Sequence, residues 1–270
     1  MNSAVVVGLF VYPIKACSAV ALQTATLHTH GLDGDRRYML VDASGTFISQ
    51  RSHPTLARVR SSLTEDSIGA AVPGRPPLSL PRRFLGERRR TTTVWDDEVR
   101  AAVHPEGSAW FSEFLEESVE LVYVADDDLR QVNPERSEPG DRVGFADGYP
   151  LLLTNEASLV ELNRHTSEPV PMDRFRPNVV VSGWPAYAED HLQTFTIGDV
   201  PFVMPKLCDR CVVTTTDQLT GERQNEPLRA LAKTRLWDQK VWFGANLIPR
   251  GVGTLTVGQV VRSDAGSGET

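Results

Sequence analysis

The sequence predicts a strand-rich α+β fold with barrel-like sheets and few helices. Short β-branched and aromatic runs alternate with turn residues along the chain of 270 residues, which contains 18 prolines and 20 glycines. Such frequent interruption favours many short strands over a few long helices. A chain of this length forms one large domain or two closely packed smaller domains.

The first half of the chain contains four predicted strands and one predicted helix. Residues 5–12 are mostly β-branched or aromatic and Pro13 follows them, so we expect a buried strand there. Further strands are expected over residues 38–42, 46–49 and 94–103, with a turn at Ala43-Ser44-Gly45 between the first two. A helix is predicted over residues 108–115, because Ser108 can cap its start and four apolar side chains then share one face.

An acidic, proline-bearing segment at residues 125–141 separates the two halves. It is nearly without apolar residues, so we expect a long surface loop or an inter-domain crossing. After it, the predicted elements are a strand or buried segment over 149–153, strands over 179–182, 193–197, 200–204, 212–216 and 254–261, and helices over 156–163 and 227–235. Residues 263–270 are expected to form a disordered tail.

Composition and charge exclude several classes of protein. The 28 basic and 35 acidic side chains give a net charge of −7, which argues against a protein that works by clamping nucleic acid or by lying on an anionic membrane. The most apolar stretch, residues 4–14, is shorter than the roughly 20 residues of a spanning helix and lacks the basic start of a secretory signal. Three cysteines, Cys17, Cys208 and Cys211, are too few for a disulfide framework, so we expect a cytoplasmic protein.

The segment Lys206-Leu207-Cys208-Asp209-Arg210-Cys211 is the most informative local feature. A structural zinc site would need two more ligands, and the sequence has no second C-x-x-C and no suitably spaced histidine pair. A thioredoxin-like motif should open a helix, whereas a β-forming run follows here at residues 212–216. Two interpretations stay open: one thiolate ligand or nucleophile, which the neighbouring cations would favour, or two buried packing thiols.

Three clusters of cations could bind an anion. In Arg174-Phe175-Arg176-Pro177-Asn178 the two arginines share one face if the backbone is extended, which suits a phosphate or carboxylate; a surface salt-bridge pair is the alternative. Lys15 follows a strand end, and Arg36 stands at a strand entrance. The five arginines within residues 82–90 are interpreted as a solvated strand-and-turn surface rather than a nucleic-acid site.

Taken together, these segments resemble the MOSC family. The similarity to the MOSC N-terminal β-barrel domain rests on Tyr12-Pro13-Ile14-Lys15, on Gly31-Leu32 followed by Asp35-Arg36, and on Gln50-Arg51-x-x-Pro54. The similarity to the MOSC domain proper rests on Asn155-Glu156-Ala157-Ser158-Leu159, Arg174-Phe175-Arg176-Pro177-Asn178, Tyr187-Ala188-Glu189-Asp190, Cys208-x-x-Cys211, Phe243-Gly244-Ala245-Asn246 and Gly253-Thr254-Leu255-x-Val257-Gly258. The motifs run in the family's order, and the chain is similar to bacterial YcbX-like proteins and to the mitochondrial amidoxime-reducing component.

The resemblance implies a domain organisation and a site. An N-terminal β-barrel-like domain over residues 1–125 would pack against a MOSC β-barrel domain with a few helices over residues 126–262, with a boundary that can interleave. Cys211 would be both the catalytic residue and the protein's ligand to molybdenum, because a soft thiolate completes the sulfur set of molybdenum cofactor. Lys15, Arg36 and Arg176 would hold the anionic pterin and its phosphate, and Asn178 and Arg210 would add hydrogen bonds. All six residues are therefore expected to line one positively charged cleft.

The resemblance also implies an activity. The relatives reduce N-hydroxylated compounds such as amidoximes and hydroxylamino-purines, so we expect a molybdenum-dependent N-hydroxylate reductase that acts on small substrates of that kind. No cysteine follows Cys211, so no iron–sulfur cluster is expected in this chain and electrons would come from a separate ferredoxin- or flavoprotein-type donor. Two alternatives stay open: a persulfide sulfur carrier for metallo-cofactor sulfuration, and a non-catalytic carrier of molybdenum cofactor.

Overall fold

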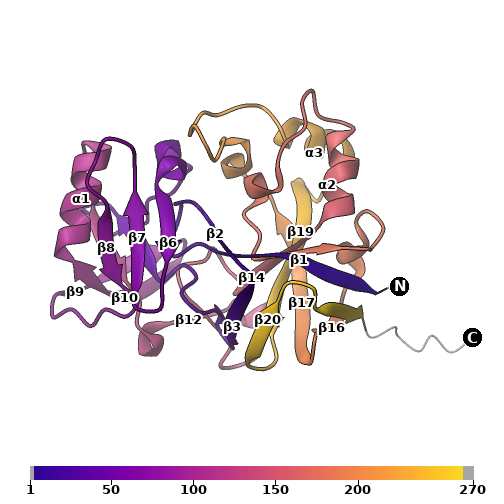
Figure 1. Ribbon diagram of the computed structural model, residues 1–270, viewed down its shortest axis with the longest axis horizontal. Coiled ribbons are helices and arrows are strands. Elements are labelled where there is room, and N and C mark those ends of the chain that lie inside the picture. Colours follow the sequence, from indigo (N-terminus) through magenta and orange to yellow (C-terminus); the bar gives the residue numbers. More distant parts are fainter. Residues whose placement is uncertain (1–2, 264–270) are drawn as a thin grey trace, which may run out of the picture.

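A closed barrel of seven strands forms one of the two lobes of the computed structural model, which describes residues 3–263 (Figure 1). Its strands follow one another in the order β14, β15, β1, β21, β16, β17 and β19, and β19 pairs again with β14 to close the ring. Their bounds are β14 (Leu151–Asn155), β15 (Val179–Ser182), β1 (Ala4–Val11), β21 (Val260–Ser263), β16 (Thr194–Ile197), β17 (Val200–Asp209) and β19 (Lys240–Pro249). Two short strands extend this sheet: β2 (Val20–Leu22) pairs with β1, and β18 (Leu236–Trp237) pairs with β19.

The first strand of the chain belongs to the barrel that the second half of the chain builds. Figure 1 shows β1, in indigo, among the orange and yellow strands of that lobe. Its register against β15 shifts between Val6 and Gly8, so the buried side chains change from Ala4 and Val6 before the bulge to Leu9 and Val11 after it. The division into domains at residues 125 and 126 stays a prediction. Under that division, β1 belongs to the first domain by sequence but lies in the barrel that the second half of the chain forms.

The other lobe holds two antiparallel sheets. One consists of β5 (Tyr38–Val41), β11 (Glu120–Tyr123), β10 (Asp97–His104) and β9 (Arg89–Val94), and the other of β6 (Arg60–Leu63), β7 (Ser67–Ala71) and β8 (Leu78–Pro81). Two smaller sheets complete the fold: β20 (Gly253–Thr256) with β3 (Thr24–His28) and β4 (Gly31–Leu32), and β12 (Arg130–Gln131) with β13 (Arg142–Val143). Each lobe has its own buried apolar core.

The helices are few and short among the described residues. The α-helices are α1 (Pro105–Leu115), α2 (Glu156–Asn163) and α3 (Leu228–Thr234). Single turns of 3₁₀ helix lie at η1 (Pro54–Arg58), η2 (Asp126–Asp128), η3 (Pro134–Arg136), η4 (Met172–Phe175), η5 (Ala188–His191) and η6 (Val212–Thr215). This composition confirms the predicted strand-rich α+β class with β-barrels and few helices. Within residues 3–263, none of the helices has the length and apolar character needed to cross a bilayer.

Several predicted elements are confirmed. The helix over 156–163 and the strand over 179–182 coincide with α2 and β15, and the first strand is one residue shifted at either end. Asn155 explains the start of α2, because its side chain accepts a hydrogen bond from Ala157 N at 3.2 Å. The helix over 227–235 is α3, with Pro227 as its N-cap.

Other predictions were wrong at turns. The strand predicted over 94–103 is confirmed as β10 from Asp97 onward, but its start is wrong, because the chain turns at Trp95 and Asp96 between β9 and β10. Residues 46–49 make only isolated bridges, Thr46 to Thr93 and Phe47 to Val41. The strand over 254–261 is two strands, β20 and β21, in different sheets. The helix over 108–115 begins earlier, since His104 caps α1 and Pro105 takes its first position.

The predicted strand over 212–216 is the 3₁₀ turn η6. Its β-branched composition favours a strand, but the threonine hydroxyls bond back to local carbonyls: Thr214 Oγ1 donates to Cys211 O at 2.9 Å and Thr215 Oγ1 to Val212 O at 2.7 Å. The preceding strand is correspondingly longer than predicted and runs to Asp209. Of the predicted tail, Ser263 ends β21, and residues 264–270 lie outside the described part of the chain.

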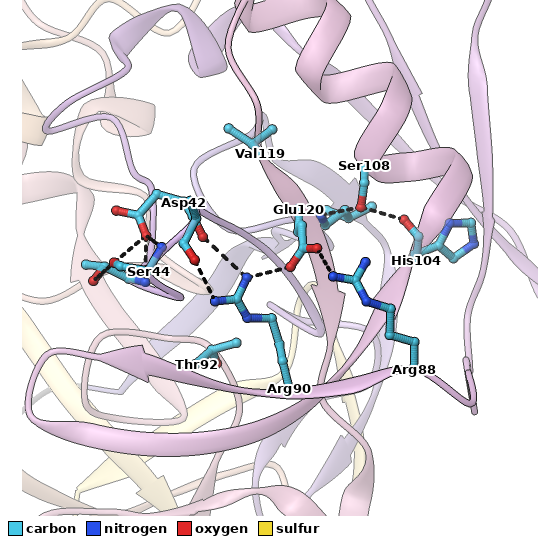
Figure 2. A network of polar contacts seen from close by, with 12 residues as sticks. Asp42, Ser44, Arg88, Arg90, Thr92, His104, Ser108, Val119 and Glu120 are labelled. Carbon is cyan, nitrogen blue, oxygen red and sulfur yellow. Dashed lines mark hydrogen bonds and ion pairs between the residues drawn. The ribbon is translucent and has the colours of Figure 1, made fainter.

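Four of the five arginines within residues 82–90, before and at the start of β9, form ion pairs with carboxylates. Figure 2 shows Arg88 and Arg90 reaching the two oxygens of the Glu120 carboxylate on β11, and the Arg90 contact measures 2.5 Å. Arg89 pairs with Asp128, and Arg82 pairs with Asp33. Exposed pairs of this kind add at most about 1 kcal/mol each, but cations that already have carboxylate partners need no external anion.

Candidate functional site

One pocket collects the predicted cofactor-binding and metal-binding residues, but Arg174 does not share a face with Arg176: it lies in the 3₁₀ turn η4 and pairs with Asp217 at 3.0 Å, outside the pocket. Both parts of the chain line the pocket. The N-terminal part contributes the loops between β1 and η1, and the C-terminal part contributes η4, the end of β17 and the start of η6. The predicted residues Lys15, Arg36, Arg176, Asn178, Arg210 and Cys211 all line it. The structure therefore brings together positions that are far apart in the sequence, while the roles assigned to them stay predictions.

Paired irregularities in β17 and β19 shape the floor of the pocket. Pro205 has no amide hydrogen to give to the sheet, and the register of β17 against β19 shifts beside it, between Val203 and Lys206. A second shift lies between Leu207 and Asp209, opposite Gly244. Gly244 has a φ of 81°, and a Cβ there would lie 2.8 Å from Leu153 O, so only glycine suits this position. The chain then leaves the barrel, and Cys211 caps η6 at the pocket wall.

Cys211 lies beside a cluster of three charged side chains. Burial opposes the charge of Arg51, but Asp147 and the Cys211 sulfur interact with its guanidinium and raise the pKa of Arg51. Arg51 Nη2 donates to Asp147 Oδ2 at 3.2 Å, and Lys15 Nζ donates to the other oxygen of that carboxylate. Burial disfavours the carboxylate, yet Lys15 and Arg51 outweigh it and hold the pKa of Asp147 well below its usual range.

Lys15 is a buried cation with two fixed partners. Its Nζ donates to Phe145 O at 2.7 Å and to Asp147, and only 6% of the residue is exposed. Burial lowers its pKa to about 8, and Asp147 opposes that shift. Lys15 therefore stays mostly protonated at neutral pH and loses its charge just above it.

Cys208 differs from Cys211 in its contacts. Its sulfur accepts a hydrogen bond from Arg210 Nη1 at 2.8 Å, while Arg210 Nη2 donates to Phe175 O at 2.7 Å. Burial raises the pKa of the Cys208 thiol, although Arg210 opposes the shift. Cys208 thus orients Arg210 toward the pocket, which both of these residues line together with Cys211.

Two arginines from opposite lobes meet on one aromatic ring. The guanidinium carbons of Arg36 and Arg176 each lie 4.3 Å from the centroid of the Tyr12 ring. Both residues have left-handed backbones, with φ of 47° and 55°, and Ala16 beside them has a φ of 72°. Strained backbone of this kind clusters at functional sites, where surrounding contacts hold it.

The cations of the pocket are unequally neutralised. Arg36 pairs with Asp35 at 2.5 Å, and Lys15 and Arg51 share Asp147. By contrast, Arg176 donates to the neutral oxygens Gln218 Oε1 at 3.0 Å and Cys17 O at 2.8 Å, and Arg210 donates to a sulfur and a carbonyl. Arg210 Nε is buried without a partner. Two guanidiniums that have no carboxylate partner in the described part of the chain and that line one pocket favour an anionic ligand.

Asn178 has a bracing role in this structure. Its Oδ1 accepts from Arg36 Nη1 at 3.0 Å and from Leu152 N at 3.2 Å, and its Nδ2 donates to Phe10 O at 3.0 Å. The residue is 1% exposed. Its carboxamide therefore fixes Arg36 against the barrel, and one amide hydrogen is left for any other contact.

Sequence reasoning missed a pair of glutamines that joins the two lobes. Gln50 Nε2 donates to Gln218 Oε1 at 3.0 Å, and Gln218 Nε2 returns a bond to Gln50 Oε1 at 3.0 Å. Because Arg176 can only donate, Gln218 Oε1 must face it, which fixes the orientation of both amides. Gln50 and Arg51 stand in the Gln50-Arg51-x-x-Pro54 motif and could have been chosen from it, whereas no motif marks Gln218.

The pocket does not hold a metal site made of protein ligands alone. Within residues 3–263, no three His, Cys, Asp or Glu side chains lie together as metal ligands. A metal bound here would have to bring most of its ligands with it. One soft sulfur at Cys211, beside guanidiniums without carboxylate partners, suits an anionic ligand that carries a soft metal.

Comparison with known proteins agrees with this arrangement. Residues 3–118 match the MOSC N-terminal beta barrel domain, and residues 140–262 match the MOSC domain. Mitochondrial amidoxime reducing component 2 of Rattus norvegicus is 30% identical over 94% of this chain and 81% of its own length. Mitochondrial amidoxime-reducing component 1 of Homo sapiens is 28% identical over 95% of this chain and 82% of its own length. The molybdenum cofactor sulfurase of Danio rerio is 29% identical over 91% of this chain, which matches 32% of that longer protein.

Proposed function

Because the chain belongs to the MOSC-domain family, with both a MOSC N-terminal β-barrel domain and a MOSC domain, we propose that it binds molybdenum cofactor and reduces N-hydroxylated compounds. Amidoximes and hydroxylamino-purines are the proposed substrate classes, and a separate protein supplies the electrons. The relatives named amidoxime reducing components, which match most of the chain, support this proposal. The observation that carries it is the pocket that Cys211 lines together with Arg176 and Arg210, neither of which has a carboxylate partner among residues 3–263.

The residues of the pocket fit molybdenum cofactor. Arg176 and Arg210 offer guanidiniums to its anionic groups, and the orphaned Arg210 Nε provides a donor that the protein itself leaves unused. Lys15 and Arg36 add positive charge from the other lobe, and Asn178 keeps Arg36 in place. Cys211 would supply the single soft sulfur ligand that the protein adds to the dithiolene sulfurs of the cofactor.

The proposed reaction consumes two electrons and two protons and releases water: an amidoxime becomes an amidine. The cofactor, when bound, supplies the two-electron chemistry that cleaves the N–O bond. The chain itself binds the cofactor by its anionic groups and keeps the pocket cationic at neutral pH. Lys15 has a pKa of about 8, so Nζ keeps its proton at neutral pH, where it donates to Phe145 O and to Asp147. Arg51, which donates to Asp147 at 3.2 Å and lines the pocket together with Cys211, adds a permanent positive charge there.

The electron donor in this proposal is a separate ferredoxin- or flavoprotein-type protein. The sequence has three cysteines, Cys17, Cys208 and Cys211, whereas an iron–sulfur cluster usually takes four. A small artificial reductant can replace such a donor in the test of the chemistry.

The test is expression in a host that makes molybdenum cofactor, followed by metal and pterin analysis and by an assay of benzamidoxime reduction with reduced methyl viologen. The proposal expects close to one molybdenum and one pterin per chain and release of benzamidine. Cofactor without turnover would indicate the non-catalytic carrier. A persulfide on Cys211 in protein that binds no molybdenum would indicate the sulfur carrier, an alternative that the similarity to a molybdenum cofactor sulfurase keeps in view. A protein with neither cofactor nor persulfide would refute all three.

A further inference from the structure

Trp95 occupies the tip of the β9–β10 hairpin, next to the pocket that contains Cys211. The turn consists of Trp95 and Asp96, since Val94 pairs directly with Asp97. Trp95 has a φ of 57°, and 48% of its surface is exposed. The first position of a two-residue hairpin turn with positive φ normally takes glycine, asparagine or aspartate. Neither the backbone nor burial therefore explains a tryptophan at this position.

The contacts of Trp95 connect it to Cys211. The Arg51 guanidinium carbon lies 4.4 Å from the centroid of the Trp95 ring, so it covers one face of the indole. The same guanidinium donates to Asp147 at 3.2 Å, and Arg51 lines the pocket together with Asp147 and Cys211. Phe47 supports the indole edge-on, with ring centroids 5.1 Å apart. Trp95 thus contacts an arginine that lines the pocket of Cys211, and 48% of the tryptophan is exposed to solvent.

We propose that Trp95, held by Arg51 and Phe47, is the surface on which the flat aromatic part of a substrate stacks while its N–O group points to the Cys211 end of the pocket. This inference rests on the proposed function and makes planar aromatic N-hydroxylated compounds, such as aryl amidoximes and hydroxylamino-purines, better substrates than aliphatic ones. An exposed indole offers a π face to any aromatic ring, and stacking of this kind discriminates aromatic from aliphatic molecules. The other exposed tryptophan, Trp237, stacks on Trp242 and on Arg235, neither of which lines this pocket.

Three variants separate stacking from folding. Trp95→Gly removes the ring and suits the positive φ, so the hairpin should be retained and the unfolding temperature should stay close to that of the parent protein. Trp95→Phe keeps a smaller ring at the same position. Trp237→Ala is the matched control, because it removes an exposed tryptophan away from the pocket.

The kinetic test compares benzamidoxime with acetamidoxime, using reduced methyl viologen so that no donor protein takes part. Trp95→Gly should lower kcat/KM for benzamidoxime about tenfold and change that for acetamidoxime by less than about twofold. Trp95→Phe should recover part of the loss, and Trp237→Ala should match the parent protein with both substrates. An equal loss with both substrates would overturn the inference, since it would make Trp95 a support for Arg51. No change with either substrate would overturn it as well.

A binding measurement gives a second readout. In protein labelled with 15N-tryptophan and kept without reductant, the indole Nε1–H signal of Trp95 is the one of five that disappears in Trp95→Gly. Benzamidoxime should shift this signal and acetamidoxime should not. A Trp95 signal that benzamidoxime leaves in place would overturn the stacking inference. If the parent protein reduced neither benzamidoxime nor acetamidoxime, the proposed function itself would be overturned. The two failures are therefore distinguishable.

Discussion

Gln218→Leu should weaken both the fold and the hold of the pocket on an anionic ligand. The Gln218 amide makes four hydrogen bonds: Oε1 accepts from Arg176 and Gln50, and Nε2 donates to Gln50 and to Thr216 O, each at 3.0 Å. Leucine has a similar volume and makes none of them. At about 1 kcal/mol for each buried bond, less about 1 kcal/mol regained from apolar burial, the net loss is about 3 kcal/mol of unfolding free energy. That loss corresponds to a Tm lowered by roughly 6–12 °C.

Gln218→Glu separates the two effects. A carboxylate keeps the acceptor that faces Arg176 but cannot donate to Gln50 Oε1 or Thr216 O, so we expect a smaller loss of stability than with leucine. The carboxylate also neutralises Arg176, which pairs with no acidic side chain of residues 3–263 in the parent protein. The affinity for the anionic cofactor should therefore fall at least about fivefold in Gln218→Glu, which is about 1 kcal/mol of binding free energy.

The assay combines thermal unfolding with molybdenum and pterin content after dialysis against cofactor-free buffer. Gln224→Leu is the matched control, because Gln224 Oε1 also accepts from an arginine, Arg174 Nη2 at 3.0 Å, but does not line the pocket. The control should retain its cofactor. If Gln218→Glu kept as much molybdenum as the parent protein, Arg176 could not be the anion-binding group that Gln218 orients.

Three further predictions test individual residues. Cys211→Ser should abolish benzamidoxime reduction with pterin still bound, and Cys208→Ser should leave substantial activity; full activity in Cys211→Ser would mean that the other sulfur is the ligand. Burial lowers the pKa of Lys15 to about 8, so cofactor affinity measured against pH should fall as the pH rises through that value, and Lys15→Arg should flatten the decline. An unchanged decline in Lys15→Arg would exclude Lys15 as its cause. Burial opposes the charge of Glu120, but Arg90 and Arg88 lower its pKa, so its contribution is present above the pKa of the unfolded state and lost as the pH falls. Glu120→Gln should cost about 1 kcal/mol in urea unfolding at neutral pH and less in acid, and an equal cost at both would contradict this account.

The sequence predicts those elements whose ends are set by local chemistry. α2 starts where Asn155 caps it, and β15 is a compact run of valines, so both were predicted at their observed bounds. The errors fall where a tertiary contact overrides local preference. Trp95 is a poor turn residue on its own, and only pairing of β9 with β10 makes it one. Residues 212–215 have strand composition, and their threonine hydroxyls satisfy a 3₁₀ turn instead.

The site could be predicted in part from motifs, because cations and a cysteine in motif order name the residues that meet in the pocket. Their partners could not be predicted in this way. Gln218 matters through Arg176 and Gln50, and Asp147 matters through Lys15 and Arg51, and both relations exist only after the two lobes pack together. Neither a glutamine nor an aspartate carries a local signal of such a role, since both are ordinary surface residues in isolation.

Two arginines of the pocket keep an unfavourable backbone conformation. Arg36 and Arg176 have φ of 47° and 55°, a region that costs an L-residue about 1–2 kcal/mol and that glycine adopts freely. Glycine at either position would relieve the strain and remove a guanidinium from the Tyr12 ring. Both arginines are present instead, and specific bonds offset the backbone strain. Asp35 and Asn178 bind the Arg36 side chain, and Gln218 and the Cys17 carbonyl bind the Arg176 side chain. Bonds that fix two cations against their own backbone preference are what a pocket for an anion requires, because the ligand then meets charges that are already in place.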